Sequence, residues 1–142
     1  MKYFIDTNII IDFLDNKEEA IEQLKTLAME EKSELFINRL VLVETLRTIR
    51  FSHKKIFREA KEKLSFFHKV DIEPEIYEEA IQFSRYCHSK GVKLKGKCEA
   101  IDFLHFITAK YYNLILISND RDLDRLESSY RDFEEIQVKD KI

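Results

Sequence analysis

Four acidic residues lie at positions where an isolated carboxylate is unexpected. Asp6 directly follows the apolar segment "YFI", and Asp120 closely follows the apolar run "LILI". Glu44 lies within "RLVLVETLRTI" and Asp102 within "EAIDFLHFITA", two segments with apolar side chains on most sides of a helix. A carboxylate in such surroundings is costly unless its charge is compensated. The chemistry of these four acids is therefore the first question that the sequence raises.

Each acid taken singly has an ordinary structural explanation. Asp6 and Asp120 would serve as helix caps or turn residues. Glu44 and Asp102 would be partners in buried salt bridges, or protonated acids that are hydrogen-bonded. These explanations stay open for each residue considered alone.

The sharper hypothesis is that Asp6, Glu44, Asp102 and Asp120 converge on one cluster from four separate segments. Carboxylates about 4 Å apart would repel one another by several kcal/mol per pair at an effective dielectric constant of about 20, so a divalent cation is their natural partner. Oxygen ligands without Cys or His favour Mg²⁺ or Mn²⁺, which also bind phosphates. The set indicates phosphodiester chemistry, with a water activated by the metal as the nucleophile.

The elements that would position these acids alternate along the chain. Apolar runs rich in β-branched and aromatic residues predict strands at 2–5, 35–38, 69–72, 114–118 and 133–138. Helical spacing of apolar residues predicts helices at 6–16, 17–32, 39–51, 55–68, 75–89, 98–111 and 122–129. Residues 90–97 hold both glycines and are predicted to form a loop.

This alternation predicts an α/β fold, a three-layer α/β/α sandwich with a mainly parallel central sheet. In such folds the functional site lies at the carboxyl ends of the strands, near the point where the strand order reverses. Asp6 and Asp120 each follow a predicted strand, which is the position that this rule requires.

Composition limits the class of protein. The chain of 142 residues, 44% hydrophobic with 11 Phe, is expected to form a single domain over residues 1–142. No apolar run approaches the length of about 20 residues that spans a bilayer, so we expect a soluble cytoplasmic protein with no membrane association. Cys87 and Cys98 are expected to be free, buried thiols in a reducing compartment. The net charge of -3 requires that any binding of nucleic acid depend on a local basic patch.

One basic segment precedes Asp102. It contains no acid and carries Arg85, His88, Lys90, Lys93, Lys95 and Lys97. Beside an acidic metal site, these cations are expected to contact the phosphates of RNA, although a solvated surface is the alternative. His105, three residues after Asp102, is interpreted as a core histidine in preference to a metal ligand.

The order of these motifs resembles a PIN-domain ribonuclease, particularly the VapC-like toxins of bacterial toxin-antitoxin pairs. The resemblance rests on "DTN" after the first strand, an isolated Glu on an early helix, "AIDFLHFITAKYYNLILISND", and "RDL" after Asp120. It implies an endoribonuclease dependent on Mg²⁺ or Mn²⁺. Its implied metal-site acids are Asp6, Glu44, Asp102 and Asp120, with Asp122 as a fifth acidic member and with Asn8 and Ser118 as polar residues that support them. Position 118 is Ser where the family more often has Thr.

The resemblance also implies a homodimer that a cognate antitoxin holds inactive. A second basic stretch at 50–63 is offset by Glu59 and Glu62, and it is interpreted as a solvated helix or as a dimer or antitoxin surface.

Two alternatives to a ribonuclease come from other classes of protein. One is a non-catalytic scaffold of the same fold that binds RNA or a protein. The other, a haloacid-dehalogenase-like phosphatase, is disfavoured because Asn8 stands where that family has a second Asp.

Overall fold

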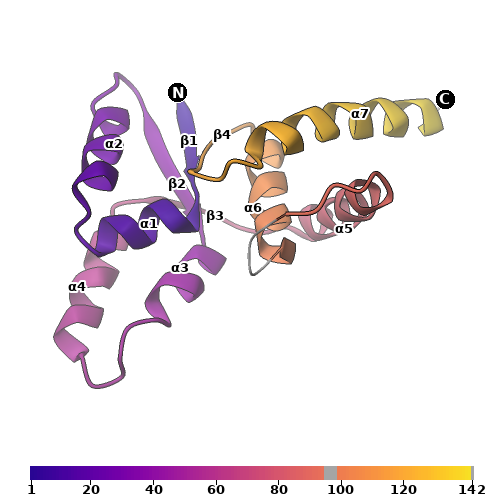
Figure 1. Cartoon of the computed structure of the whole chain (residues 1–142). Coiled ribbons are helices and arrows are strands. Elements are labelled where there is room, and N and C mark those ends of the chain that lie inside the picture. Colours follow the sequence, from indigo (N-terminus) through magenta and orange to yellow (C-terminus); the bar gives the residue numbers. More distant parts are fainter. Residues whose placement is uncertain (95–98, 142) are drawn as a thin grey trace. The chain divides into compact units, whose positions relative to one another are not determined.

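The computed structural model describes residues 1–94 and 99–141, and within them it contains four strands and seven helices (Figure 1). The described chain divides into two compact units. The first unit comprises Met1–Ile72 and Tyr112–Asn119. The second comprises the described residues of Glu73–Tyr111 and Asp120–Ile142. No helix in the described part of the chain is both long enough and apolar enough to cross a membrane.

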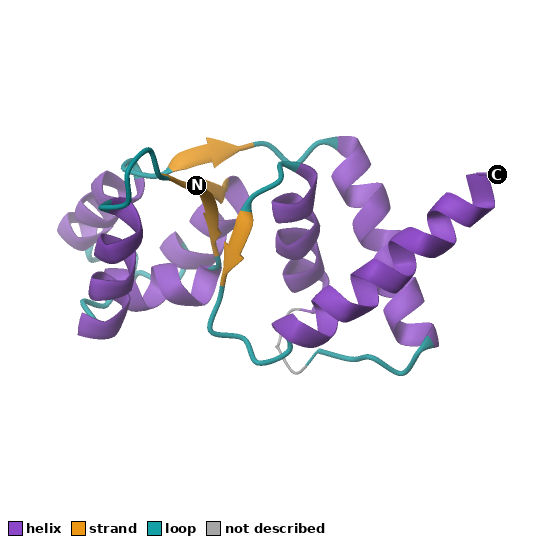
Figure 2. Cartoon of the chain, turned by 90° about the horizontal axis from the view of Figure 1, so that it is seen from above, coloured by secondary structure: helices purple, strands orange, loops and turns teal. Residues whose placement is uncertain are grey.

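The first unit contains a parallel four-stranded sheet, drawn in orange in Figure 2. Its strands are β1 (Lys2–Ile5), β2 (Glu34–Asn38), β3 (His68–Val70) and β4 (Ile115–Ile117), in the order β3-β2-β1-β4. Phe4 in β1 pairs with Phe36 in β2 and with Leu116 in β4. The side chains of β1 from residue 3 to residue 5 are all buried, as expected for a central parallel strand. The α/β class predicted from the sequence is confirmed, and the sheet is entirely parallel.

The strand order reverses at β1. The chain passes from β1 to β2 and β3 on one side of the sheet, and it returns late to place β4 on the other side of β1. The backbone N–H of Asp6 donates a hydrogen bond to the carbonyl oxygen of Ile117 across 3.0 Å, which brings the carboxyl ends of β1 and β4 together. This is the topological position where α/β folds place their sites.

Four helices belong to the first unit: α1 (Thr7–Leu14), α2 (Glu18–Ala28), α3 (Arg39–Leu46) and α4 (Lys54–Leu64). Helix α1 packs against α2 and α3, and α3 also packs against α4 and β2 (Figure 1). Helix α3 ends five residues before the predicted boundary at residue 51. The hydroxyls of Thr45 and Thr48 donate to the carbonyl oxygens of Val41 and Thr45, and such bonds compete with the regular helical pattern.

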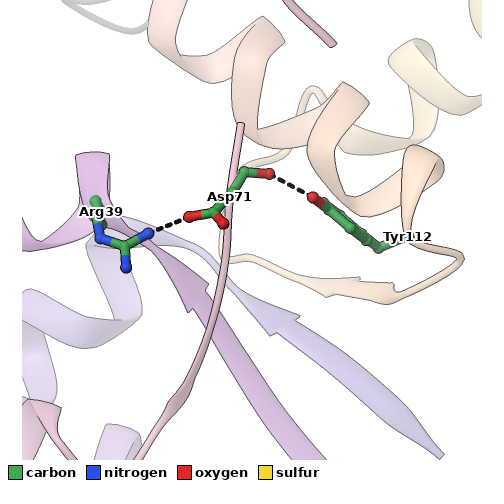
Figure 3. A network of polar contacts seen from close by, with 3 residues as sticks. All are labelled: Arg39, Asp71 and Tyr112. Atoms are coloured by element: carbon green, nitrogen blue, oxygen red, sulfur yellow. Dashed lines mark hydrogen bonds and ion pairs between the residues drawn. The ribbon is translucent and has the colours of Figure 1, made fainter. Parts of the chain in front are cut away.

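A polar network joins the ends of β2 and β3 within the first unit (Figure 3). The guanidinium of Arg39, the first residue of α3, pairs with the carboxylate of Asp71, which follows β3. The hydroxyl of Tyr112 donates to the backbone carbonyl of Asp71 across 2.6 Å. Because Arg39 and Asp71 are both exposed, their ion pair contributes little to stability.

The second unit contains the helices α5 (Pro74–Ser89), α6 (Glu99–Tyr111) and α7 (Leu123–Lys141). Helix α5 packs against α6 and α7. Phe83 lies at the centre of this packing and is fully buried. Its ring centroid lies 5.3 to 5.5 Å from the rings of Phe103, Phe106, Tyr130 and Phe133. Pro74 begins α5 at a position where its missing N–H costs no helical hydrogen bond.

The predicted strand at 133–138 is wrong, because these residues belong to α7. Leu126, Tyr130 and Phe133 are buried at a spacing of four and three residues, which places them on one helical face. Ile136 and Val138 are 41% and 59% exposed, so the apolar residues that suggested a strand do not form a buried face. The predicted helix at 122–129 is the first part of the same 19-residue helix.

Candidate functional site

Asp6 is buried at the carboxyl end of β1, with 9% of its surface exposed. It is the N-cap residue of α1, and its Oδ1 accepts a hydrogen bond from the backbone N–H of Thr7 across 2.8 Å. Its Oδ2 accepts a hydrogen bond from the hydroxyl of Ser118, which follows β4, across 2.7 Å. The capping explanation therefore accounts for only one of the two carboxylate oxygens.

Asn38 offers a comparison at the end of the neighbouring strand. It is fully buried, it is the N-cap residue of α3, and its Oδ1 accepts from the N–H of Val41 across 3.0 Å. This is the usual capping bond to the third helical residue. An uncharged amide thus caps α3, whereas α1 begins at a carboxylate that also faces Ser118. Sequence reasoning missed Asn38, although an Asn between a strand and a helix is a recognised capping signal.

Glu44 on α3 is half-buried, and its Oε1 accepts a hydrogen bond from the hydroxyl of Thr7 across 2.7 Å. The expectation that apolar side chains surround Glu44 on most sides needs correction, because its neighbour Val43 is 59% exposed. One hydrogen-bonded group thus joins the residue that follows β1, the first residue of α1, a residue of α3 and the residue that follows β4; these are Asp6, Thr7, Glu44 and Ser118. Sequence reasoning did not identify Thr7, although it lies within the quoted "DTN".

Asn8, the second residue of α1, is exposed. Its predicted support of the acids remains a prediction.

The other predicted acids belong to the second unit. Asp102 is half-buried in the first turn of α6. Oδ1 of Asp120 accepts a hydrogen bond from the backbone N–H of Asp122 across 2.9 Å, which is the contact of an Asx turn. Asp122 is buried immediately before α7, and Arg125 lies 3.5 Å from its Oδ1. The turn explanation thus accounts for this contact of Asp120, and the contact of the Asp122 carboxylate is an ion pair with Arg125.

The chemistry of the donors suits a hard divalent cation, because all the candidate ligands are carboxylates. Asp6 accepts one hydrogen bond at each oxygen, and an ionised carboxylate has about four lone-pair positions, so coordination is compatible with both bonds. Across residues 1–94 and 99–141, no group of three or more His, Cys, Asp or Glu side chains is placed as a metal ion requires. Within the first unit, Asp6 and Glu44 are the candidate donors that hydrogen bonds hold in place.

The basic segment before Asp102 is partly engaged in contacts within its own unit. Arg85 donates to the side chain of Gln82 across 2.9 Å, and the Lys90 ammonium lies 5.9 Å from the centre of the Tyr86 ring. Lys93 is exposed. Lys95 and Lys97 lie outside the described residues.

Glu99, at the start of α6, contacts two residues of the basic segment, His88 and Leu94. Its Oε2 accepts from the backbone N–H of Leu94 across 2.9 Å, and its Oε1 lies 2.5 Å from Nε2 of His88. The hydrogen bond from the N–H of Leu94 holds the pKa of the Glu99 carboxyl below its usual value, and the contact with His88 lowers that pKa to a smaller extent. Cys87 nearby is a free, buried thiol, and burial raises its pKa to about 11. Cys98 lies outside the described residues.

Comparisons with known proteins identify the family and the fold of this chain. The family model described as "PIN domain" matches residues 3–128. No curated protein matches the chain. The solved structure of VapBC2 from Rickettsia felis, bound to a DNA fragment from its promoter, has a TM-score of 0.73 and 21% identity, covering 89% of this chain and 93% of that one.

Two further solved structures show the same fold. DNA-bound VapBC from Salmonella typhimurium has a TM-score of 0.72 and 19% identity, covering 89% of this chain and 92% of that one. FitAcB from Neisseria gonorrhoeae has a TM-score of 0.65 and 19% identity, covering 84% and 88%. Because the family model spans most of the sequence, the chain belongs to the PIN-domain family, whose members are nucleases.

Proposed function

We propose that this protein is an endoribonuclease dependent on Mg²⁺ or Mn²⁺, and that it is the toxin of a toxin-antitoxin pair. One observation carries the nuclease assignment. Asp6, at the reversal of strand order in a PIN-domain chain, is oriented by Ser118 and linked through Thr7 to a second carboxylate, Glu44. A capping residue alone would not require this second carboxylate or the hydroxyl of Ser118.

The proposed ligands of the cation are Asp6, Glu44, Asp102 and Asp120, with Asp122 as a fifth acid and with Asn8 as a supporting polar residue. When bound, a divalent cation would activate water toward a phosphodiester and neutralise charge that develops on the leaving oxygen. The chain's own contribution is orientation, because Ser118 fixes one oxygen of Asp6 and the N–H of Thr7 fixes the other.

RNA is the proposed substrate. Arg85, Lys90, Lys93, Lys95 and Lys97 are proposed to contact its phosphates. The exposed Lys93 and the partly engaged Arg85 and Lys90 support this proposal among the described residues. Cations near an acidic site would lower the repulsion that the carboxylates exert on a polyanion.

An antitoxin is the proposed protein partner, and the active form is proposed to be a homodimer. A similar solved structure from Klebsiella pneumoniae, with a TM-score of 0.62 and 21% identity, is a toxin-antitoxin complex. In this chain, a groove of about 770 Å³ runs along the end of α3 and the start of α4. Its lining residues are Leu46, Arg47, Ile49, Arg50, Phe51, Lys54, Phe57 and Arg58.

The composition of this α3–α4 groove indicates the chemistry of the segment that would occupy it. Four of the eight lining residues are cationic, the other four are apolar, and none is acidic. Phe51 is 97% exposed, which is unusual for a large apolar side chain. An amphipathic antitoxin segment with acidic residues beside apolar anchors would complement both features. The stretch at 50–63, whose composition is typical of a solvated helix or of a dimer or antitoxin surface, contributes most of this groove.

The nuclease proposal is tested with the purified full chain and a fluorescent single-stranded RNA, in Mg²⁺, in Mn²⁺ and in EDTA. Each of Asp6→Asn, Glu44→Gln, Asp102→Asn and Asp120→Asn should lower the cleavage rate by at least about 100-fold. Asp132→Asn on the exposed part of α7 is the matched control and should cleave normally. Cleavage that persists in EDTA would contradict the metal dependence, and RNA that is bound but never cut would indicate a scaffold.

The antitoxin proposal is tested by co-expression with the protein encoded next to this gene, followed by co-purification. Phe51→Ala and Arg50→Glu should weaken the complex. Ile136→Ala, which alters an exposed apolar residue of α7, should leave it intact. A complex that is equally stable in all three variants would rule out the α3–α4 groove as the docking site. Absence of any complex with the wild-type chain would remove the toxin-antitoxin assignment and leave the nuclease proposal standing.

A further inference from the structure

Thr7 connects two carboxylates that belong to different elements. It is the first residue of α1 and has only 6% of its surface exposed. Its backbone N–H donates to Oδ1 of Asp6 across 2.8 Å, and its hydroxyl donates to Oε1 of Glu44 across 2.7 Å. One residue thus contacts the acid at the end of β1 and the acid on α3.

The other threonines of the chain behave differently. Each of them donates its hydroxyl to a backbone carbonyl three or four residues earlier in its own segment. These residues are Thr26, Thr45, Thr48 and Thr108, and their acceptors are the carbonyl oxygens of Glu22, Val41, Thr45 and Leu104. Thr7 begins its helix, so no earlier turn of α1 supplies such a carbonyl, and its hydroxyl is directed to a side chain of another helix. A local backbone bond therefore does not explain the orientation of its hydroxyl.

The contact constrains a side chain that would otherwise be adaptable. Glu44 is half-buried, and a glutamate side chain has several rotatable bonds. Mg²⁺ requires near-ideal octahedral geometry, so carboxylates that bind it benefit from being held in place before the ion arrives. Hydrogen bonds to ligating carboxylates commonly have this role, and their removal typically lowers metal affinity or activity by about 10-fold to 100-fold.

We propose that Thr7 is a positioning residue, which holds the carboxylates of Asp6 and Glu44 in one arrangement suited to a shared divalent cation. This inference rests on the proposed function, because it assumes that both acids bind the cation. Ser118 donates to Asp6 as well, at the other carboxylate oxygen. Thr7 extends the same hydrogen-bonded group to Glu44, which lies on a separate helix.

The test compares Thr7→Val, which keeps the branched shape and removes the hydroxyl, with Thr7→Ser, which keeps the hydroxyl. Mn²⁺ binding is measured by isothermal titration calorimetry, and RNA cleavage is measured separately. Thr7→Val should bind Mn²⁺ about 10-fold to 100-fold more weakly, with a lower kcat and little change in KM for RNA. Thr7→Ser should retain most of the wild-type affinity. Thr48→Val is the control, because it removes a hydroxyl bonded to a backbone carbonyl, and it should bind Mn²⁺ normally.

A double-mutant cycle identifies the group through which Thr7 acts. In a Glu44→Gln background, Thr7→Val should weaken Mn²⁺ binding by less than about threefold more, because the partner of the hydroxyl is already altered. Urea unfolding of each variant reports whether the chain remains folded, and Thr7→Ser provides a folded comparison if Thr7→Val is unstable.

Two results would overturn the inference while leaving the proposed function intact. One is wild-type Mn²⁺ affinity in folded Thr7→Val, and the other is an equal loss of affinity in Thr7→Val and Thr7→Ser, which would indicate packing and not the hydroxyl. A wild-type chain that neither binds Mn²⁺ nor cleaves RNA would instead overturn the proposed function, and the inference with it.

Discussion

The hydroxyl of Ser118 donates a hydrogen bond to Oδ2 of Asp6 across 2.7 Å, although 112 residues separate the two in sequence. The contact forms because β1 and β4 are neighbours in a parallel sheet and their carboxyl ends share one edge. It gives Asp6 a partner that helix capping does not explain. The bond is therefore an observation on which the proposed role of Asp6 rests.

Removal of this hydroxyl should be measurable. Ser118→Ala should lower the free energy of unfolding by about 1 to 3 kcal/mol, because a hydrogen bond to a charged group is lost. It should also weaken Mn²⁺ binding, whereas Ser118→Thr should preserve both properties. Urea titration and calorimetry check the two effects. Ser89→Ala, which removes an exposed hydroxyl bonded to a backbone carbonyl, is the control and should change stability by no more than about 0.5 kcal/mol. Equal effects of the two alanine substitutions would contradict this role of Ser118.

Phe83 is predicted to be the most sensitive core position of the second unit. Its ring contacts aromatic rings from both α6 and α7. Phe83→Ala should lower the free energy of unfolding by about 3 to 5 kcal/mol, because it removes buried surface and leaves a cavity. Phe83→Leu should have a smaller effect. Chemical denaturation followed by circular dichroism measures both, and a loss below about 1 kcal/mol for Phe83→Ala would contradict the described packing.

Glu99 is predicted to make stability depend on pH. Its folded pKa lies below the usual value of 4.5, so its ionised form stabilises the folded state above the unfolded pKa. That contribution should be lost as the pH falls through the folded pKa. The difference in unfolding free energy between wild type and Glu99→Gln should therefore be largest near neutral pH and should shrink in acid.

Urea titrations at a series of pH values measure this difference. Glu135→Gln, at an exposed position of α7, is the matched control and should show little difference at any pH. A difference for Glu99→Gln that stays constant from neutral pH into acid would show that the carboxylate is not stabilised by Leu94 and His88.

Cys87 is predicted to be chemically inert in the folded protein. At pH 8, a pKa of about 11 in place of 9.0 leaves roughly 100-fold less thiolate, and burial further restricts access. In a Cys98→Ser background, alkylation of Cys87 by iodoacetamide should be at least about 100-fold slower in buffer than in 8 M urea. Mass spectrometry follows the modification. Rapid alkylation of the folded protein would show that Cys87 is accessible.

Local sequence signals predicted most of the regular elements. The aromatic and β-branched residues of "KYFI" predicted β1 at its observed bounds, and Pro74 marked the start of α5 to within one residue. Helix α7 shows the limit of such reasoning. The apolar residues of "FEEIQV" partly alternate with polar ones, which is typical of a strand. Ile136 and Val138 are in fact exposed, and the helix is recognised from the packing of Leu126, Tyr130 and Phe133.

The sequence pointed to some residues of the candidate site and not to others, for a physical reason. Asp6 stands directly after a strand, and strand ends are recognisable in sequence, whereas Ser118 was identified through the resemblance to the PIN-domain family. Thr7 and Asn38 were missed because their importance depends on which side chains the fold brings within hydrogen-bond distance. The hydroxyl of Thr7 meets Glu44 only through the packing of α1 against α3, which no local pattern encodes.

The most direct test of the central claim is cleavage of a mixed pool of cellular RNA by the purified chain, with Asp6→Asn beside the wild type. Asp15→Asn, at the exposed C-cap position of the helix that Asp6 begins, is the matched control. Wild type and Asp15→Asn should cut RNA in Mg²⁺ or Mn²⁺, and cutting should disappear in EDTA and in folded Asp6→Asn. Intact RNA under every condition, or equal cutting by Asp6→Asn and wild type, would contradict the claim that Asp6 is part of a metal-dependent nuclease site.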